Sequence, residues 1–333
     1  MENLKKDVMI DLQPSPKRLN IATDNFLEDV EKGLHSSPKY LCSKYFYDKK
    51  GDELFQRIMS SKEYYLTDSE MEIFSTQTVE LANAVLEKAE IIDVAELGPG
   101  DAAKSTWLLR ELSKRNALND YFPIDISENI VDLLNKALPE QIPGINIYGL
   151  NGEYLNMLLQ ATQISNNRKL VLFLGANIGN FKFAEMPAFC KKLRSLLSEG
   201  DMVLIGFDLK KDPEKILAAY DDSEGFTKQF NLNLLRRINN ELNADFDLNN
   251  FKHYAMYDPD SGACKSYLVS MRRQKVSLNG SVINFGKDET IFMEISQKYT
   301  VGEIDEICRQ CGFVPGNYFF DTKRYFVDVI WKC

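Results

Sequence analysis

The sequence has few histidines and lacks long apolar runs and internal repeats. Several classes of protein depend on one or another of these features. Its 333 residues include only two histidines, His35 and His253, which lie far apart in the chain. No apolar run approaches the roughly 20 residues that a membrane-spanning helix needs, and there are no internal repeats or low-complexity tracts. We therefore expect no membrane span, no metal site built from histidines and no repeat architecture.

Acidic residues outnumber basic ones by 49 to 40, which gives a formal net charge of −9 and a pI of about 5.0. Such a balance disfavours nucleic acids and anionic membranes as partners, so we expect a small-molecule substrate and favour a monomer. Residues 1–18 are polar and charged, unlike a signal peptide. The six cysteines are therefore expected to be reduced thiols of a cytoplasmic protein.

Two of these cysteines, Cys308 and Cys311, have the C-x-x-C spacing of some redox and metal sites. The sequence contains no second pair of this kind, and Gly312 is a typical stop signal for a helix. We interpret the pair as two cysteines at the end of a helix rather than as a site.

The stretch 91–112 contains the motif on which the functional prediction depends. Residues 91–97 form an apolar run typical of a buried strand, Gly98-Pro99-Gly100 follows, and 105–112 is predicted to be a helix. Glycine tolerates positive φ and lets a ligand approach the backbone, and the start of a helix offers free N–H groups. This order indicates a ligand-binding turn, although a tight turn without a ligand has the same pattern.

The residues around the turn bear on which ligand it would take. A dinucleotide site usually has a third glycine where this chain has Ala103. The next predicted strand ends at Asp125, where a carboxylate can accept the ribose hydroxyls of either NAD or S-adenosylmethionine. Asp101 would lie beside the pyrophosphate of NAD, and its negative charge would be unfavourable there. The acidic turn therefore favours S-adenosylmethionine, which has no phosphate and carries two cationic groups.

Strands and helices alternate through the middle of the chain, as in a parallel α/β sheet. Further strands are predicted at 121–125, 145–150, 169–174, 202–208, 318–321 and 324–331, and helices at 20–35, 52–59, 67–88, 127–137, 213–220, 227–242 and 302–311. The last two strands resemble a hairpin at the end of the sheet. A class I methyltransferase has that ending and a Rossmann dehydrogenase does not.

Three local patterns give further expectations. Thr67 and Glu70 have the spacing of a capping box, which predicts that a long helix begins there. Residues 264–299 alternate like antiparallel strands, with a hairpin signal at Asn279-Gly280. Glu294 and Ser296, two positions apart on one of these strands, are expected to share a face.

Together these motifs resemble the histidine Nα-methyltransferases of ergothioneine biosynthesis, which belong to a wider set of amino-acid N-methyltransferases. The resemblance runs from about residue 44 to the end of the chain. It is carried by Lys44-Tyr-Phe-Tyr-Asp48, Glu63-Tyr-Tyr-Leu-Thr67, Glu96-Leu-Gly-Pro-Gly100, Phe173-Leu-Gly-Ala-Asn-Ile-Gly-Asn180 and Glu294-Ile-Ser296.

The resemblance implies a class I methyltransferase fold, a Rossmann-like doubly wound α/β sheet, with a second α+β lobe that binds the substrate. The methyltransferase core would comprise 72–210 and 298–333, and the substrate lobe 1–71 and 211–297. It also implies a cofactor, S-adenosylmethionine, held by Gly98, Gly100, Lys104, Asp125, Glu153 and Tyr154.

For the substrate, the resemblance implies two groups of residues. The amino and carboxylate groups of an amino acid would be held by Tyr64, Gly175, Asn180 and Tyr220, and its ring by Tyr47, Glu294 and Ser296. Tyr47, Asn180 and Tyr220 are the candidate catalytic residues. Ser266 falls where the family has a methionine beside the ring, a change that enlarges or polarises the ring pocket.

The implied reaction is Nα-methylation of L-histidine to its trimethyl betaine, hercynine. We see no histidine placed to act as a base, so the proton would leave to water or through a network touching Tyr220 or Asn180. Three other functions remain open at this point. They are methylation of another amino acid such as tryptophan or a modified derivative, a non-catalytic binding module, and a dehydrogenase.

Overall fold

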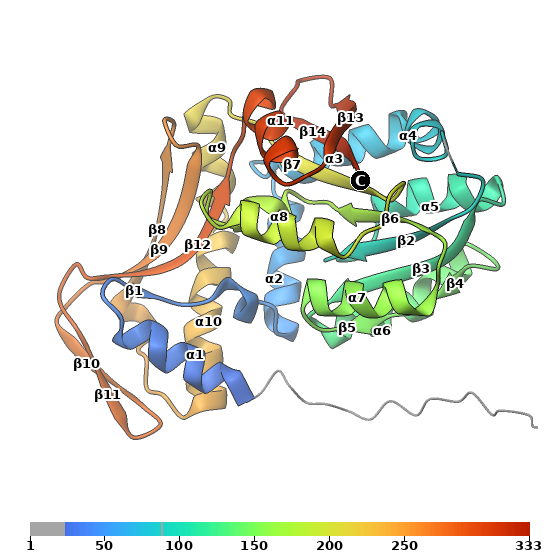
Figure 1. The fold of residues 1–333 in the computed structure, drawn as a ribbon. Helices are drawn as coiled ribbons and strands as arrows, with labels where there is room; N and C mark the ends of the chain where they lie inside the picture. The colour runs from blue at the N-terminus through green and yellow to red at the C-terminus, as the bar shows by residue number, and fades with distance from the viewer. Residues whose placement is uncertain (1–23, 88) are drawn as a thin grey trace, which may run out of the picture.

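The computed structural model describes residues 24–87 and 89–333 and contains two main sheets with helices packed around them (Figure 1). The predicted segment 1–18 lies outside the described residues. The larger sheet has the order β13-β14-β7-β6-β2-β3-β4, with β5 also paired to β3. Its strands are β2 (Ile92–Leu97), β3 (Leu118–Asp125), β4 (Asn146–Ile147), β5 (Leu150–Asn151), β6 (Arg168–Phe173), β7 (Met202–Asp208), β13 (Val314–Phe320) and β14 (Phe326–Lys332).

The pairing in this sheet confirms the predicted fold class. β2 runs parallel to both β3 and β6, and β6 runs parallel to β7. β14 is antiparallel to β7 and to β13, so the chain ends in the predicted hairpin. The strand order reverses on either side of β2, and in such sheets ligands bind at the carboxyl ends of the strands beside the reversal.

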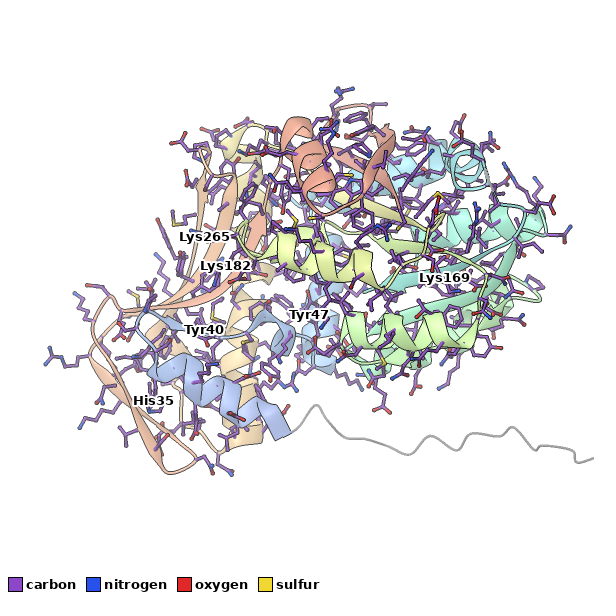
Figure 2. All side chains as sticks on the ribbon, viewed as in Figure 1. His35, Tyr40, Tyr47, Lys169, Lys182 and Lys265 are labelled. Carbon is purple, nitrogen blue, oxygen red and sulfur yellow. The ribbon has the colours of Figure 1, made fainter. Side chains whose placement is uncertain are left out.

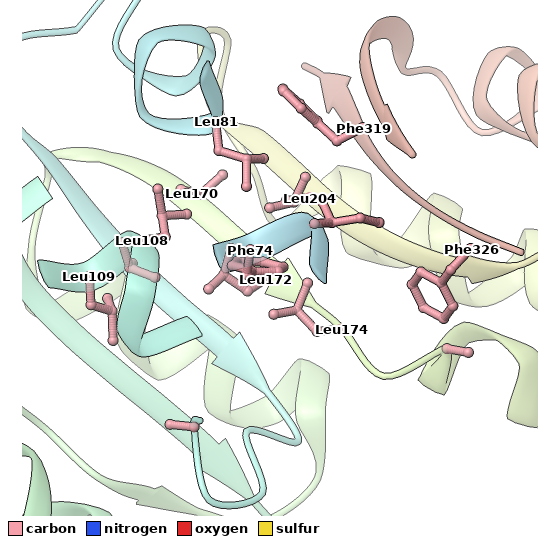
Figure 3. Packing of buried hydrophobic residues seen from close by; sticks show 14 of the residues in the cluster. Phe74, Leu81, Leu108, Leu109, Leu170, Leu172, Leu174, Leu204, Phe319 and Phe326 are labelled. Carbon is pink, nitrogen blue, oxygen red and sulfur yellow. The ribbon is translucent and has the colours of Figure 1, made fainter. Parts of the chain in front are cut away.

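Apolar clusters fill both faces of the sheet, because its central strands are buried on both sides. One cluster, part of which is drawn in Figure 3, joins the sheet to α3 (Tyr65–Thr76), α4 (Thr78–Val85), α5 (Ser105–Lys114) and α6 (Glu128–Gln141). The other cluster joins it to α7 (Tyr154–Ile164), α8 (Met186–Ser195) and α11 (Val301–Gln310).

Two predictions about the larger sheet and its helices were wrong. The single strand expected at 145–150 is two short strands, because Gly149 between them packs directly against Val131 and Asn135 of α6. The single helix expected from Thr67 to about residue 88 is two helices that break at Gln77, whose Nε2 donates to the carbonyl oxygen of Phe320 at 2.9 Å.

The predicted capping box is also wrong, because α3 already begins at Tyr65. Thr67 therefore lies inside the first turn of the helix. The side chain of Glu70 is completely buried and bonds to residues far away in the sequence instead of to the start of its own helix.

The second sheet has the order β1-β12-β9-β8, and a separate hairpin, β10-β11, extends beside it. The Asn279-Gly280 turn of this hairpin has the predicted positive φ angles, 45° and 87°. The strand β8 was not predicted. The elements of this part are α1 (Asp24–His35), β1 (Lys39–Tyr40), η1 (Ser43–Phe46), α2 (Lys49–Met59), α9 (Pro213–Tyr220), α10 (Phe226–Leu242), η3 (Leu248–Asn250), β8 (Phe251–Asp258), β9 (Ala263–Ser270), β10 (Gln274–Leu278), β11 (Ser281–Phe285) and β12 (Thr290–Gln297).

The two sheets meet where β12 ends. Residues just beyond β12 form a parallel bridge to the larger sheet, between Leu209 and Tyr299. The 3-10 helix η2 (Asn177–Asn180), which follows β6, lies against β12, and the hypothetical Cβ of Gly179 would come within 2.8 Å of the carbonyl oxygen of Gln297. The proposed boundaries of the two lobes stay predictions. Within the described residues, no helix is long and apolar enough to cross a membrane.

Replacing Trp331 by alanine should destabilise the fold without touching the site. Trp331 is fully buried and packs against Phe207 and Phe313, with ring centroids 5.8 and 5.4 Å away. Loss of a large core aromatic typically costs about 3–5 kcal/mol, which denaturant unfolding would measure. Val314→Ala, at an exposed position in β13, is the control and should change the unfolding free energy little. Equal stability of the two variants would contradict this account of the core.

Candidate functional site

The turn after β2 has the left-handed backbone that its glycines predict. Gly98 and Gly100 have φ of 67° and 57°. A Cβ on Gly98 would lie 2.7 Å from the Tyr154 hydroxyl and 3.0 Å from the Asn177 amide nitrogen, whereas a Cβ on Gly100 would meet nothing within 4 Å. The turn is therefore closely packed at Gly98 and open beside Gly100, which leaves room for a ligand against the backbone.

Asp125 lies at the carboxyl end of the neighbouring strand, as predicted. Its Oδ1 accepts a hydrogen bond from the Ser127 backbone N–H at 2.8 Å, and burial raises the pKa of the carboxyl to about 6. Burial raises the pKa of Tyr154 and of Tyr47 as well, and the charge of Asp125 adds to both shifts. Glu153 is exposed, 3.9 Å from the Lys44 ammonium.

Behind the turn lies a buried charged cluster that sequence reasoning missed. The Glu70 carboxylate accepts the Gly175 backbone N–H on both oxygens, at 2.8 and 2.9 Å, and forms an ion pair with Lys104. A Cβ on Gly206 would meet the same carboxylate directly. Glu70 therefore ties together the helix α3, the start of α5 and the loop after β6.

Asp328 on β14 is the second carboxyl of this cluster. It is fully buried, and neither of its oxygens accepts a hydrogen bond from any residue that the structure describes. Burial, followed by the charge of Glu70, holds the pKa of Asp328 well above its usual range. Asp328 therefore binds a proton more tightly than an ordinary aspartate, and the cation Lys104 is paired with Glu70.

A cavity lies between the two sheets and collects most of the predicted substrate residues. Seven of them line it, from α3, η2, α9, β12 and the loops beside them: Tyr47, Tyr64, Gly175, Asn180, Tyr220, Glu294 and Ser296. The sequence analysis gave no role to the other lining residues, which are mostly apolar: Phe55, Ile58, Leu66, Ala176, Asn177, Ala219, Thr227 and Phe230. Leu66, Ala176 and Asn177 lie inside the quoted motifs, whereas the others had no signal that core residues do not share.

Aromatic rings form the walls of the cavity. Tyr47, labelled in Figure 2, meets Phe55 and Phe230 edge-on, with centroids 5.8 and 5.7 Å away, and Tyr64 meets Tyr220 at 6.3 Å. Burial raises the pKa of Tyr47, Tyr64 and Tyr220 well above the usual value. These phenols therefore stay neutral and can donate a proton in a hydrogen bond as well as accept one.

Glu294 places a carboxyl group in this otherwise aromatic cavity. Burial raises its pKa to about 7, against hydrogen bonding and the charge of Lys298, which lower it. Ser266 is the partner of Glu294 across the strand pair β9-β12 and is itself buried. Ser266 is not among the residues that line the cavity, so it lies beside Glu294 and not on the cavity surface.

Tyr220 and Ser296 are joined by a hydrogen bond of 2.7 Å from the phenol to the serine Oγ. Lys298, which the sequence did not single out, donates to both of these oxygens, at 2.7 and 2.9 Å. Neither histidine lines the cavity; His253 bonds the backbone oxygen of Tyr220 at 3.0 Å. Among the described residues, no group of three or more histidine, cysteine or carboxylate side chains could hold a metal ion.

Comparison with known proteins gives a consistent result. A family model described as a histidine-specific, S-adenosylmethionine-dependent methyltransferase matches residues 26–333. The chain is 34% identical over 307 residues to the histidine N-alpha-methyltransferase of Mycolicibacterium smegmatis, covering 92% of this chain and 94% of that one. It is 34% identical over 273 residues to the enzyme of the same name from Mycobacterium tuberculosis, covering 81% and 83%. A solved S-adenosylmethionine-dependent methyltransferase from Clostridium acetobutylicum aligns with a TM-score of 0.42 and 10% identity, over 79% of this chain and 90% of that one.

The raised pKa of Asp328 gives a prediction about stability and pH. Between the unfolded and the folded pKa of this carboxyl, the folded protein holds a proton that the unfolded chain releases, so the stabilisation is full below the unfolded pKa and is lost as the pH rises through the folded pKa. The loss approaches about 1.4 kcal/mol per pH unit. In Asp328→Asn that slope should disappear when the unfolding free energy is measured from acidic to neutral pH. Asp260→Asn, at an exposed position, is the control, and parallel curves for wild type and Asp328→Asn would refute the assignment.

Proposed function

Because the chain belongs to the family of histidine-specific, S-adenosylmethionine-dependent methyltransferases, we propose that it methylates the α-amino group of free L-histidine to give the trimethyl betaine hercynine. The observation that supports histidine most directly is Glu294, a buried carboxyl in an aromatic cavity. An imidazole N–H would satisfy this carboxyl, whereas a purely apolar ring would leave it unpaired, and sites built on such hydrogen bonds reject the unmatched ligand strongly.

The residues at the carboxyl ends of β2 and β3 fit S-adenosylmethionine, which supplies an electrophilic methyl group when bound. The open backbone at Gly100 gives room for the ligand, and Gly98 fixes the turn against Tyr154. We propose that Asp125 accepts the ribose hydroxyls and that Lys104, held in place by Glu70, contributes a cation. Glu153 and Tyr154 complete the proposed set.

The proposed substrate would be held at both ends. Tyr64, Gly175, Asn180 and Tyr220 would bind the amino and carboxylate groups, and Tyr47, Glu294 and Ser296 would surround the ring. All seven line one cavity, which supports the assignment. Their task is positioning, because aligning a nitrogen lone pair with the methyl–sulfur axis supplies much of the rate of an in-line transfer.

The amine must be neutral to react, since an ammonium has no lone pair. No histidine lines the cavity in the described part of the chain, so we propose that the proton leaves to water or along hydrogen bonds that touch Tyr220 or Asn180. We further propose that the enzyme acts as a monomer in the cytoplasm and has no nucleic-acid partner.

The deciding experiment is incubation of the protein with S-adenosylmethionine and all twenty amino acids, followed by mass spectrometry. The expected products are methylated histidines ending in the trimethyl form. If another amino acid is methylated and histidine is not, the substrate assignment is wrong. If S-adenosylmethionine binds and no product appears, the protein is a binding module.

The raised pKa of Asp125 predicts how cofactor binding depends on pH. Hydroxyl donors favour the ionised carboxylate, so affinity for S-adenosylmethionine should be level above about pH 6 and fall below it. Asp125→Asn should bind more weakly at pH 8 by about 1.5–3 kcal/mol and should lose the acid limb. Titration calorimetry measures both effects, with the exposed Asp132→Asn as control. An unchanged affinity in Asp125→Asn would remove this residue from the cofactor site.

Glu294→Gln should impair histidine methylation selectively. Loss of a buried, charge-assisted hydrogen bond is expected to weaken transition-state binding by about 2–4 kcal/mol. This loss would be measured as a lower kcat/KM for histidine. Discrimination against tryptophan should relax at the same time, because no unpaired carboxylate would then be buried. Competition assays with both amino acids test this, with exposed Glu306→Gln as control. Unchanged histidine kinetics would mean that Glu294 does not read the ring.

A further inference from the structure

A buried lysine stands directly behind the wall of the cavity. Lys298, the residue after β12, is completely buried and does not line the cavity itself. Its ammonium donates to the Tyr220 hydroxyl at 2.7 Å and to Ser296 Oγ at 2.9 Å. On its other side it forms an ion pair of 2.7 Å with Asp208, at the end of β7 in the larger sheet.

The lysine is paired with an ionised carboxylate. Burial alone would raise the pKa of Asp208, but the charges of Lys298 and Lys211 together hold it below its usual value, so Asp208 is ionised. Asp208 also accepts the Tyr65 hydroxyl at 2.8 Å. As the cationic partner of this 2.7 Å ion pair, the Lys298 ammonium has hydrogens to donate and no lone pair.

The hydrogen bonds around Ser296, together with the acidity of its phenol partner, indicate the direction in which this hydroxyl acts. A hydroxyl has two acceptor lone pairs and one proton. The Ser296 oxygen receives the Tyr220 hydroxyl at 2.7 Å and the Lys298 ammonium at 2.9 Å, so both lone pairs are taken. Either hydroxyl of this pair can donate to the other, and the phenol, as the stronger acid, is the better donor, so we assign the shared proton to Tyr220. Ser296 lines the cavity, and its own proton is then offered to whatever occupies the cavity.

Glu294 offers a hydrogen-bond acceptor, whereas Ser296 offers a donor. It lies two residues before Ser296 on β12, so both side chains face the cavity. In its ionised form, which an N–H donor in the cavity would favour, this carboxylate only accepts hydrogen bonds. The ring end of the cavity consequently presents one acceptor and one donor, which is the pattern that complements an unprotonated imidazole with its one N–H and one bare nitrogen.

We propose that Lys298 is a positioning residue that forces the Ser296 hydroxyl to act as a donor, so that the cavity selects a neutral ring with one N–H and one unprotonated nitrogen. This inference rests on the proposed methylation of histidine. It adds which protonation state of the substrate ring the enzyme binds. An imidazolium, which has two N–H groups and no acceptor, would leave the Ser296 proton facing another donor.

The test compares histidine with the two pyrrolylalanine isomers, in which one or the other ring nitrogen is replaced by CH. Both isomers keep one N–H and lack the acceptor. Wild-type enzyme should prefer histidine over each isomer by at least about a hundredfold in kcat/KM, because a buried donor would be left unpaired. Lys298→Met removes the N–H groups and keeps the chain length. Ser296 can then turn its proton away from the ring, and the preference should fall at least about tenfold, mainly through KM for histidine.

The chain provides a matched control. Lys169 is also a buried lysine, paired with Asp93 at 2.9 Å, but it lies at the opposite end of the strands, away from Tyr47 and the cavity (Figure 2). Lys169→Met should lose stability in a similar way and leave the ring preference unchanged. If Lys298→Met does not fold, Lys298→Met/Asp208→Asn removes the pair together and should show the same loss of preference. Ser296→Ala, which removes the donor itself, should show it as well.

The outcomes separate two kinds of failure. If wild-type enzyme does not methylate histidine, the proposed function fails. If it does, and the preference over both isomers in Lys298→Met and in Ser296→Ala stays within about twofold of wild type, the role of Lys298 and Ser296 is overturned and the proposed function stands. The role of Lys298 and Ser296 is also overturned if Lys169→Met loses the preference for histidine over the isomers. Lost stability alone would then explain the change in preference.

Discussion

The ion pair between Asp208 and Lys298 is the constraint on which the geometry of the cavity depends. Asp208 ends a strand of the larger sheet, and Lys298 follows the last residue of a strand in the second sheet. A buried ion pair is tolerable only when its remaining donors and acceptors are satisfied. Here Tyr65, Lys211, Tyr220 and Ser296 satisfy them. The same bonds fix the relative position of the two sheets and of the cavity wall between them.

Three of the buried carboxyl sites have different surroundings, and the surroundings of each suit its place in the fold. Asp208 has two lysines beside it and is ionised. Glu70 is paired with Lys104, and burial, followed by the charge of Glu70, raises the pKa of the neighbouring Asp328. Glu294 is not in an ion pair within the described part of the chain, and its pKa of about 7 leaves it close to balance between the two forms. A group so poised gains most from a ligand that donates a hydrogen bond, which is the behaviour expected of a recognition residue and not of a structural one.

Local patterns predicted the parts of the fold that are decided locally. Continuous apolar runs identified the central parallel strands, and Asn279-Gly280 identified the hairpin, because burial on both faces and positive φ leave direct marks on the sequence. The capping box at Thr67 failed because Glu70 has partners at Gly175 and Lys104 that no local pattern reveals. Lys298 and Asp328 were missed for the same reason, since a charged residue in a strand reads as solvent-facing until its buried partner is known.

The arrangement also separates the two tasks that the proposed reaction needs. Gly175 and Asn180, which would hold the end common to all amino acids, follow a strand of the larger sheet, beside the cofactor turn. Glu294 and Ser296, which would read the ring, belong to β12 of the second sheet. A change in Glu294 can therefore alter which ring is accepted while the reacting nitrogen keeps its position. A change in Lys298 would not be confined in this way, because its ammonium bonds both Tyr220, which is proposed to hold the amino and carboxylate groups, and Ser296, which is proposed to face the ring. In the proposed reaction, ring recognition and amine placement would thus be coupled through one buried lysine.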